Sequence, residues 1–409
     1  MKSCSFCDNW TCKHLDDSAP GIPVLIPHDA MLAEQRNALA AGGINVGWFE
    51  GHDYLYEKHF TPGRELQNKR LILEFEGVYR KAEVYLNGEK LAFRPYGYSN
   101  FYVDISESVK LEQKNTLQVI ARNADQPNSR WYSGAGIYRP VRLWVSDEQR
   151  ILLNGVQIQT CSIDPIRVEV RVRTSCPGSI LLEIMDGKET LFQQEGQTEG
   201  ETCISVPLPQ AQLWSPETPK LYTCRVRFRD DEQTAVFGIR SISWGRVHHD
   251  DGSLGAACWP DAVERKVRLL QENGYNAIRS AHNPCSKALL ETCDRLGMLV
   301  MDEYIDHWYI HKTEYDYVEY FADWWRQDLQ DMVEKDFNHP CVILYSTGNE
   351  VSETAQEKGI ALTKEMTDYL HQLDPSRPVT CGVNIFFNFR SSIGFGVYSD
   401  KKAKQEAKK

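Results

Sequence analysis

The spacing of apolar residues changes near Gly245, and this change limits what the chain can fold into. Before that point, short runs such as RLILEFEGV and IRVEVRVRT alternate apolar and polar residues, which is the period of half-buried strands. After it, stretches with apolar residues three or four positions apart alternate with short apolar runs. The sequence therefore predicts antiparallel β domains followed by an α/β domain with a parallel sheet.

The 409 residues of the chain are too many for one ordinary domain, so several domains are expected. The β part alone is long enough for two sandwiches. Asn87-Gly88 lies between two strand-like runs and predicts a type I′ hairpin turn, which needs positive φ at both residues. We predict one sandwich over residues 24–147 and a second, of immunoglobulin-like size, over residues 148–243. Residues 1–23 are predicted to be a leader outside the folded domains.

Residues 244–409 read as strand–helix units, and polar side chains gather directly after the predicted strand ends. Active sites of (β/α)8 barrels lie at the carboxyl ends of the strands. A complete barrel takes roughly 250 residues, more than this segment provides, so an incomplete (β/α)8 TIM barrel is predicted. The gathered polar residues are Arg279 and His282, Asp302 and Glu303, and Asn349 and Glu350.

The formal net charge of −11 and the ordinary glycine and proline content argue against a nucleic-acid binder, a disordered chain and a collagen. No stretch approaches the ~20 apolar residues of a membrane span, and the first residues lack the pattern of a signal peptide. A small neutral partner is expected, with no nucleic acid and no membrane. An oligomer is compatible with the sequence, but nothing specifies the assembly.

The twelve cysteines are mostly scattered singly, which is typical of free thiols in a reducing compartment. We therefore predict a cytoplasmic protein. One cluster, Cys4, Cys7, Cys12 and His14, could in principle hold zinc in a tetrahedron. Its spacing is tighter than that of common zinc motifs, so a solvent-facing leader is the favoured reading and the zinc site is the alternative.

Glu350 ends the apolar run CVILYSTGNE, where Gly348 leaves room for the backbone. A carboxyl partly withdrawn from water at this point could protonate a leaving oxygen near neutral pH. An ordinary surface glutamate at a strand end is the alternative. The residues alone leave the two readings at even weight.

Four motifs in order resemble glycoside hydrolase family 2, the family of β-galactosidases and β-glucuronidases. The resemblance runs from about Val24 to Val383 and implies a jelly-roll sugar-binding domain, an immunoglobulin-like sandwich and the first half of a TIM barrel. The motifs are RWYSGAGIYRPV (130–141), NAIRSAHNP (276–284), LGMLVMDE (296–303) and NHPCVILYSTGNE (338–350).

Carried over by this resemblance, Glu350 matches the general acid/base and Asn349 the residue that hydrogen-bonds the sugar 2-hydroxyl. Arg279 resembles the arginine that fixes active-site carboxylates, with a salt bridge inside the barrel as the alternative. Further positions that resemble residues lining the sugar pocket are His249, Asp250 and His282.

Trp308 could stack on a sugar face, although an aromatic residue at this place as often packs. Some β-galactosidases of the family hold magnesium shortly after the third strand of the barrel. The corresponding positions here are Asp306 and Trp308. An indole cannot bind magnesium, which prefers oxygen ligands. No metal is therefore predicted at that site, and no cofactor is predicted.

The sequence departs from the family pattern in two places. A retaining glycosidase needs a second carboxyl as nucleophile, and in the family this glutamate lies beyond the point that corresponds to Lys409. Between FGIRSISW and VHHDD, the first barrel strand is predicted to be deleted or badly shortened. We therefore expect a C-terminally truncated chain that keeps the acid/base, lacks the nucleophile and is inactive alone.

The leading hypothesis is a retaining β-glycosidase acting on terminal non-reducing β-glycosides, with β-galactosides favoured over β-glucuronides. The alternative is a non-catalytic carbohydrate-binding fragment or pseudo-enzyme that uses the β domains and the residual pocket. Hydrolysis of nitrophenyl glycosides discriminates between these two classes.

Overall fold

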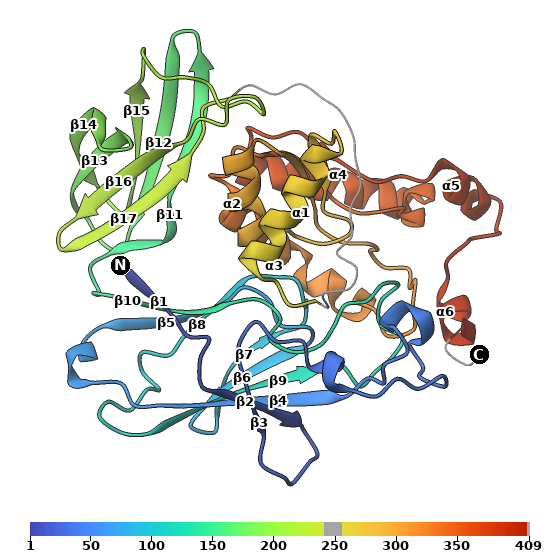
Figure 1. Ribbon diagram of the computed structural model, residues 1–409. Helices are drawn as coiled ribbons and strands as arrows, with labels where there is room; N and C mark the ends of the chain where they lie inside the picture. Colours follow the sequence, from blue (N-terminus) through green and yellow to red (C-terminus); the bar gives the residue numbers. More distant parts are fainter. Residues whose placement is uncertain (241–255, 407–409) are drawn as a thin grey trace.

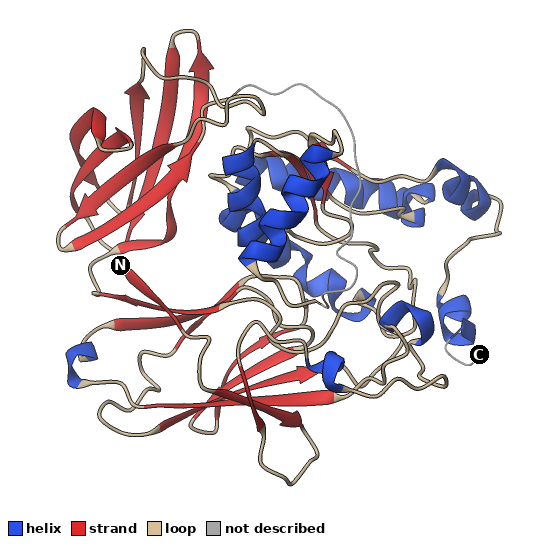
Figure 2. Ribbon diagram, viewed as in Figure 1, coloured by secondary structure: helices blue, strands red, loops and turns tan. Residues whose placement is uncertain are grey.

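The computed structural model describes residues 1–240 and 256–406. Figure 1 shows the chain as three regions, and Figure 2 shows that two of them are built of strands and the third mainly of helices around a small sheet. Within the described residues, none of the helices combines the length and the apolar character that crossing a membrane requires. This architecture confirms the predicted fold class of two β-sandwiches and a partial TIM barrel.

The first sandwich consists of two antiparallel sheets, with strand orders β3-β2-β4-β9-β6-β7 and β1-β10-β5-β8. Alternate residues of β9, such as Leu117, Val119 and Ala121, are buried between the sheets. The strands are β1 (Lys2–Ser5), β2 (Trp10–His14), β3 (Ile22–Val24), β4 (Asp53–Phe60), β5 (Arg70–Phe75), β6 (Ala82–Leu86), β7 (Glu89–Arg94), β8 (Phe101–Asp104), β9 (Asn115–Arg122) and β10 (Val141–Ser146). Short 3-10 helices lie at η1 (Ala30–Ala33), η2 (Gly43–Val46) and η3 (Arg64–Leu66).

The first 23 residues belong to this sandwich and do not form the leader that the sequence predicts. β1 pairs with β10, and β2 pairs with both β3 and β4. Trp10 is 1% exposed and packs in the sandwich core, which anchors this segment. The strands escaped prediction because they are only three to five residues long, too short for the alternation to be recognised among polar neighbours.

The second sandwich packs a three-stranded sheet, β11-β12-β15, against a four-stranded sheet, β14-β13-β16-β17. Its core is aliphatic, and Val168, Val170 and Val172 of β12 contribute alternate residues to it. The strands are β11 (Ile151–Ile163), β12 (Ile166–Thr174), β13 (Gly178–Asp186), β14 (Glu189–Thr198), β15 (Glu201–Pro207), β16 (Tyr222–Phe228) and β17 (Asp231–Phe237).

The third region contains a parallel sheet with the sequential order β18-β19-β20-β21. These four strands compare with the eight of a closed TIM barrel, so the described residues form a partial barrel. The strands are β18 (Ala277–Arg279), β19 (Leu299–Glu303), β20 (Val342–Ser346) and β21 (Val379–Thr380). The helices are α1 (Pro260–Glu272), α2 (Lys287–Leu296), α3 (Val318–Asp336), η5 (Ser352–Ala355), α4 (Glu357–Leu373), α5 (Ile385–Ser392) and α6 (Asp400–Glu406).

The first sandwich and the partial barrel share one buried interface. Asp328 of α3 is 1% exposed, and its carboxylate accepts hydrogen bonds from four side chains of both regions. The donors are Arg94 (2.9 Å) and Ser99 (3.1 Å) of the sandwich, and Tyr304 (2.9 Å) and Tyr317 (2.8 Å) of the barrel. This contact brings sandwich loops to the carboxyl ends of the barrel strands.

Candidate active site

Except for Trp308, the predicted site residues that the structure describes gather at one edge of the parallel sheet. Arg279 is the last residue of β18, Glu303 is the last residue of β19, and Asn349 follows β20 by three residues. Parallel strands end at the same edge, so these side chains meet there. His249 and Asp250, and the segment predicted to lack the first barrel strand, lie outside the described residues.

Glu303 organises the first part of the cluster. Its side chain is fully buried and receives the Arg279 guanidinium, with Nε at 3.0 Å and Nη2 at 2.8 Å from Oε2. Nδ1 of His282 lies 2.9 Å from Oε1, and the Ser346 hydroxyl donates to Oε2 at 2.8 Å. A buried carboxylate needs this number of donors, and Glu303 thereby fixes both Arg279 and His282.

Asn349 is held at both ends of its carboxamide. Arg279 donates to Oδ1 at 2.6 Å, and Nδ2 donates to Asp306 Oδ1 at 2.8 Å. Its backbone is also held, because the N–H donates to Ile305 O at 3.0 Å and the carbonyl accepts from Lys312 Nζ at 2.8 Å. The amide orientation is therefore set before any ligand arrives.

Asp306 joins the barrel to the first sandwich. Its carboxylate accepts two hydrogen bonds from Arg130, at 2.8 and 2.6 Å, and one from Lys312 at 2.9 Å. Burial favours protonation, but Lys312 and Arg130 outweigh it and hold the pKa of Asp306 far below its ordinary range. Asp306 is thus a fixed anion between two cations, one of which comes from a sandwich loop.

Glu350 follows Asn349 with a backbone φ of 45°, in the left-handed region. Few residues other than glycine adopt this conformation, and such outliers cluster at functional sites. Its Oε1 accepts a hydrogen bond from Asn384 Nδ2 at 3.0 Å. Burial lowers the pKa of Arg130, but Asp306 and, more weakly, the Glu350 carboxylate raise it above its ordinary value, so Glu350 lies within electrostatic reach of the cluster.

Trp308 lies in the core and not on an accessible face. Its side chain is fully buried, and the indole N–H donates to Thr347 O at 3.0 Å. The Trp308 backbone N–H donates to Glu353 Oε1 at 3.1 Å, as do the N–H groups of Tyr309 and Ile310 at 3.0 Å each. This is the packing alternative that the sequence left open, and a fully buried indole offers no face for a sugar to stack on.

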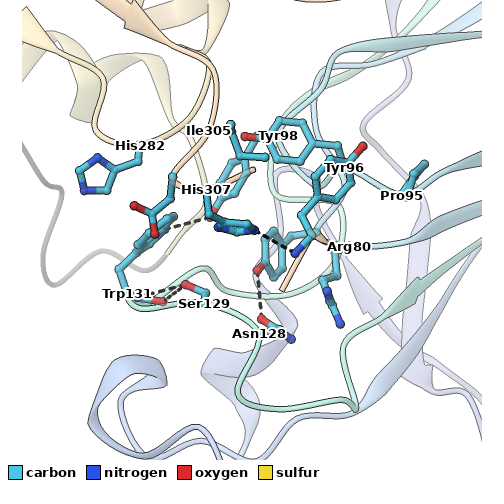
Figure 3. Close-up of a pocket in the computed structure, with 14 residues that line it drawn as sticks. Arg80, Pro95, Tyr96, Tyr98, Asn128, Ser129, Trp131, His282, Ile305 and His307 are labelled. Carbon is cyan, nitrogen blue, oxygen red and sulfur yellow. Dashed lines mark hydrogen bonds between the residues drawn. The ribbon is translucent and has the colours of Figure 1, made fainter. Parts of the chain in front are cut away.

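Figure 3 shows a cavity at the junction of the sandwich and the barrel, beside this cluster. The sandwich contributes Tyr79, Tyr96 and Trp131 to its wall, and the barrel contributes Asp306 and His307. The cavity has a volume of about 40 Å³. That is room for one or two water molecules and far below the roughly 300–1,000 Å³ of ligand pockets.

The four residues of the possible zinc motif do not converge. Cys4 Sγ donates to Leu143 O at 3.7 Å and Cys7 Sγ to Val141 O at 3.3 Å. Burial raises the pKa of the Cys12 thiol to about 12, and Cys12 lies apart in β2. The Cys4 and Cys7 thiols both hydrogen-bond to backbone carbonyls of β10. The sequence spacing therefore does not produce a zinc site from these four residues.

Three family models match successive parts of the chain. Residues 28–159 match the glycosyl hydrolase 2 galactose-binding domain-like model, residues 155–240 the glycosyl hydrolases family 2 model, and residues 242–408 the glycosyl hydrolases family 2 TIM barrel domain. The three matches together span nearly all of the chain.

Individual relatives agree with these matches. Beta-galactosidase BoGH2A of Bacteroides ovatus is 35% identical over 436 residues, covering 88% of this chain and 50% of the relative. A beta-glucuronidase of Bacteroides fragilis is 25% identical, covering 80% of this chain and 54% of the relative. The chain thus spans about half the length of these relatives.

A solved structure of a glycosyl hydrolase family 2 member from Bacteroides cellulosilyticus superimposes with a TM-score of 0.87 at 31% identity. The alignment covers 96% of this chain and 58% of that protein. Matching models along nearly the whole sequence and a matching fold lead to one assignment: the chain belongs to glycoside hydrolase family 2.

Proposed function

We propose that this protein is a retaining β-glycosidase for terminal β-galactosides, with Glu350 as its proton donor. The observation that carries the proposal is the position of Glu350, which occupies left-handed backbone directly after the doubly held Asn349. A strained residue beside a fixed polar group is an arrangement that active sites maintain at a cost to stability.

In this proposal, Asn349 hydrogen-bonds the sugar hydroxyl next to the anomeric carbon, a contact that strengthens in the oxocarbenium-like transition state. Glu350 protonates the glycosidic oxygen as the bond to the anomeric carbon breaks. Arg279 orients Asn349, while His282, held by Glu303, contributes a ring nitrogen toward the sugar. His249 and Asp250 complete the proposed pocket on the family resemblance.

The charge balance of the cluster supports a neutral sugar. The three cationic side chains Arg130, Arg279 and Lys312 are paired with the carboxylates Asp306 and Glu303. Glu350 adds a third negative charge, so among the described residues this cluster carries no surplus of positive charge for the carboxylate of a glucuronide. A galactoside needs no such counter-charge, and BoGH2A, the relative with 35% identity, is named a beta-galactosidase.

We propose that the 409-residue chain alone does not form a glycosyl-enzyme. A retaining mechanism needs a second carboxyl about 5–5.5 Å from the acid/base. Three neighbouring carboxylates already have firm partners: Glu303 binds Arg279, Asp306 binds two cations, and Glu353 accepts three backbone N–H groups. All three are also buried, at 2% exposed or less, so we assign the role of nucleophile to none of them.

Buried thiols support a reducing compartment such as the cytoplasm. Cys285, Cys293 and Cys341 are free cysteines buried in the core cluster of the barrel. Burial raises the pKa of each thiol, so all three stay protonated at neutral pH. The exposed cysteines Cys4, Cys161 and Cys203 form no disulfide either, which is typical of proteins that remain in a reducing environment.

The test combines turnover and binding by the purified chain. Nitrophenyl β-galactoside and β-glucuronide should show no hydrolysis above buffer. A galactose-shaped iminosugar, whose protonated ring nitrogen pairs with a carboxylate, should bind by titration calorimetry, and Glu350→Gln should weaken that binding at least tenfold. Glu357→Gln, which removes an exposed charge at the start of α4, is the matched control and should leave the affinity unchanged.

Equal iminosugar affinity for the parent chain and Glu350→Gln would overturn the role of Glu350. Tighter binding of a glucuronic-acid-shaped iminosugar would overturn the choice of sugar. Hydrolysis that Glu350→Gln abolishes would support the proton donor and contradict the inactivity of the chain alone.

A further inference from the structure

A second cluster of chemically reactive side chains lies in the first sandwich. It consists of His14 at the end of β2, Glu34 directly after η1, and His52 directly before β4. One ligand atom from each lies within 4.8 Å of the other two. Neither the family resemblance nor the proposed glycosidase mechanism gives these residues a role.

The sheet register brings the two histidines together. β2 pairs with β4 so that His14 lies opposite Tyr54, and His52 precedes Tyr54 by two residues. Residues two apart on a strand face the same side, so the imidazoles are diagonal neighbours across the strand pair. Their rings stack with centroids 4.3 Å apart and an interplanar angle of 14°.

Glu34 closes the cluster from a different segment. Its Oε1 lies 2.7 Å from His14 Nε2, and its Oε2 lies 3.9 Å from His52 Nε2. The Tyr54 hydroxyl donates to Glu34 Oε1 at 3.1 Å, which orients the carboxylate. Partners of this kind commonly fix the ligands of metal sites.

We propose that His14, Glu34 and His52 bind one first-row divalent metal ion of the zinc class. Two imidazole nitrogens and a carboxylate oxygen are a common three-residue ligand set for such ions, with water in the fourth position. Bond lengths near 2.0–2.1 Å require ligand atoms ~3.4 Å apart, which small side-chain rotations reach from the present spacing. The side chains are 36%, 17% and 34% exposed, so an ion and its water can enter.

This site differs from both metal expectations drawn from the sequence. It shares only His14 with the cysteine motif, and it is separate from the position of Asp306 and Trp308. Its residues lie 20 and 18 positions apart in the chain, so no short motif reveals them. The bound ion would tie η1 to β2 and β4 near one edge of the six-stranded sheet.

The test is titration of the purified, chelator-treated chain with Co²⁺, followed by absorption spectroscopy. Cobalt bound to imidazole and carboxylate absorbs in the visible range, whereas thiolate ligands add an intense near-ultraviolet charge-transfer band. The three exposed cysteines Cys4, Cys161 and Cys203 make this distinction necessary. We expect one equivalent with a visible spectrum, competed out by Zn²⁺, and a higher thermal midpoint in saturating Zn²⁺.

His14→Ala and His52→Ala should each weaken Co²⁺ binding at least tenfold. His59→Ala is the matched control, because His59 lies on β4 and pairs with a single carboxylate, Glu57, at 3.2 Å. Glu34→Gln keeps the shape of the side chain and decides the matter if a histidine variant fails to fold. Parent-like binding by Glu34→Gln, or a spectrum dominated by the thiolate band, would overturn the proposal.

Discussion

The carboxamide of Asn349 has a single favourable orientation. Oδ1 faces the Arg279 guanidinium at 2.6 Å, and Nδ2 faces the Asp306 carboxylate at 2.8 Å. A flipped amide would place N–H groups against a cation and an oxygen against an anion. In the proposed mechanism this preorganisation favours the reaction, because a group that is already aligned loses no entropy when the transition state forms.

Asp306→Asn should strongly destabilise the chain. The substitution leaves the Lys312 ammonium, whose side chain is only 2% exposed, without its counter-charge. Losing one partner of a buried ion pair costs about 3 kcal/mol of the free energy of unfolding. Urea denaturation measures this change, and adding Lys312→Met in the same chain should restore part of it.

The comparison for that experiment is Asp368→Asn, which breaks the exposed pair between Lys364 and Asp368 on α4. An exposed pair of this kind contributes about 0.5 kcal/mol or less. If Asp306→Asn lowers the free energy of unfolding no more than Asp368→Asn does, the buried cluster does not have the importance assigned to it.

The sequence indicated part of this site and missed the rest for a physical reason. Arg279, Asn349 and Glu350 stand at strand ends, and strand ends are visible in the apolar pattern. The link from Arg130 to Asp306 spans 176 residues and cannot be read from local spacing. The pattern also places Trp308 after a strand without indicating that its ring turns into the core.

Among the elements, the β6–β7 hairpin combines a predicted turn with an unpredicted charge network. Asn87 and Gly88 have φ values of 53° and 87°, which confirms the positive φ expected of both turn residues. At the other end of β6, Glu83 accepts hydrogen bonds from Tyr85 at 2.6 Å, Lys90 at 2.8 Å and Arg122 at 2.5 Å. The turn can be predicted from Asn87 and Gly88 alone. The charge network cannot, because it includes Arg122 of a third strand, β9.

Glu83 should make stability depend on acidic pH. Burial raises its pKa, but hydrogen bonds from Lys90, Tyr85 and Arg122 outweigh it and lower the pKa from 4.5 to about 2. The folded state therefore binds fewer protons than the unfolded state between these values. The contribution is present above pH 4.5 and is lost as the pH falls toward 2.

The contribution of Glu83 to the free energy of unfolding should be about 1 kcal/mol. This value is reduced to allow for solvent screening, because Lys90 and Arg122 are partly exposed. Denaturation of the parent chain and Glu83→Gln at several pH values measures it, and the difference between them should shrink on acidification. Glu89→Gln, an exposed position on β7, should show no such trend. A parent–variant difference that stays constant across this range would refute the network.

On the scale of the whole molecule, the first sandwich and the partial barrel behave as one packed unit. Tyr79, Tyr96 and Tyr98 of the sandwich lie in the same core cluster as Tyr304 and Tyr317 of the barrel. The alternation in the sequence predicts each region but gives no sign of this contact, because the tyrosines lie outside the regular strands of the sandwich.

Asp328→Ala should loosen this interface. The change leaves the buried Arg94 guanidinium without one of its carboxylates and removes the acceptor shared by Tyr304 and Tyr317. We expect the free energy of unfolding to fall by about 3 kcal/mol. In calorimetry, the unfolding transitions of the sandwich and the barrel should separate. Asp323→Ala, at an exposed position of α3, is the control, and matching thermograms for the two variants would contradict this role of Asp328.

The salt bridge from Arg130 to Asp306 has a consequence for protein engineering. Asp306, which aligns Asn349, is paired with Arg130 from a loop of the first sandwich. The barrel alone therefore lacks one of the residues that hold Asn349 in place. Chimeras that graft this barrel onto a foreign sandwich must therefore transfer the 130–141 loop as well. Recombination breakpoints placed between the two domains would otherwise separate a carboxylate from the arginine that neutralises it.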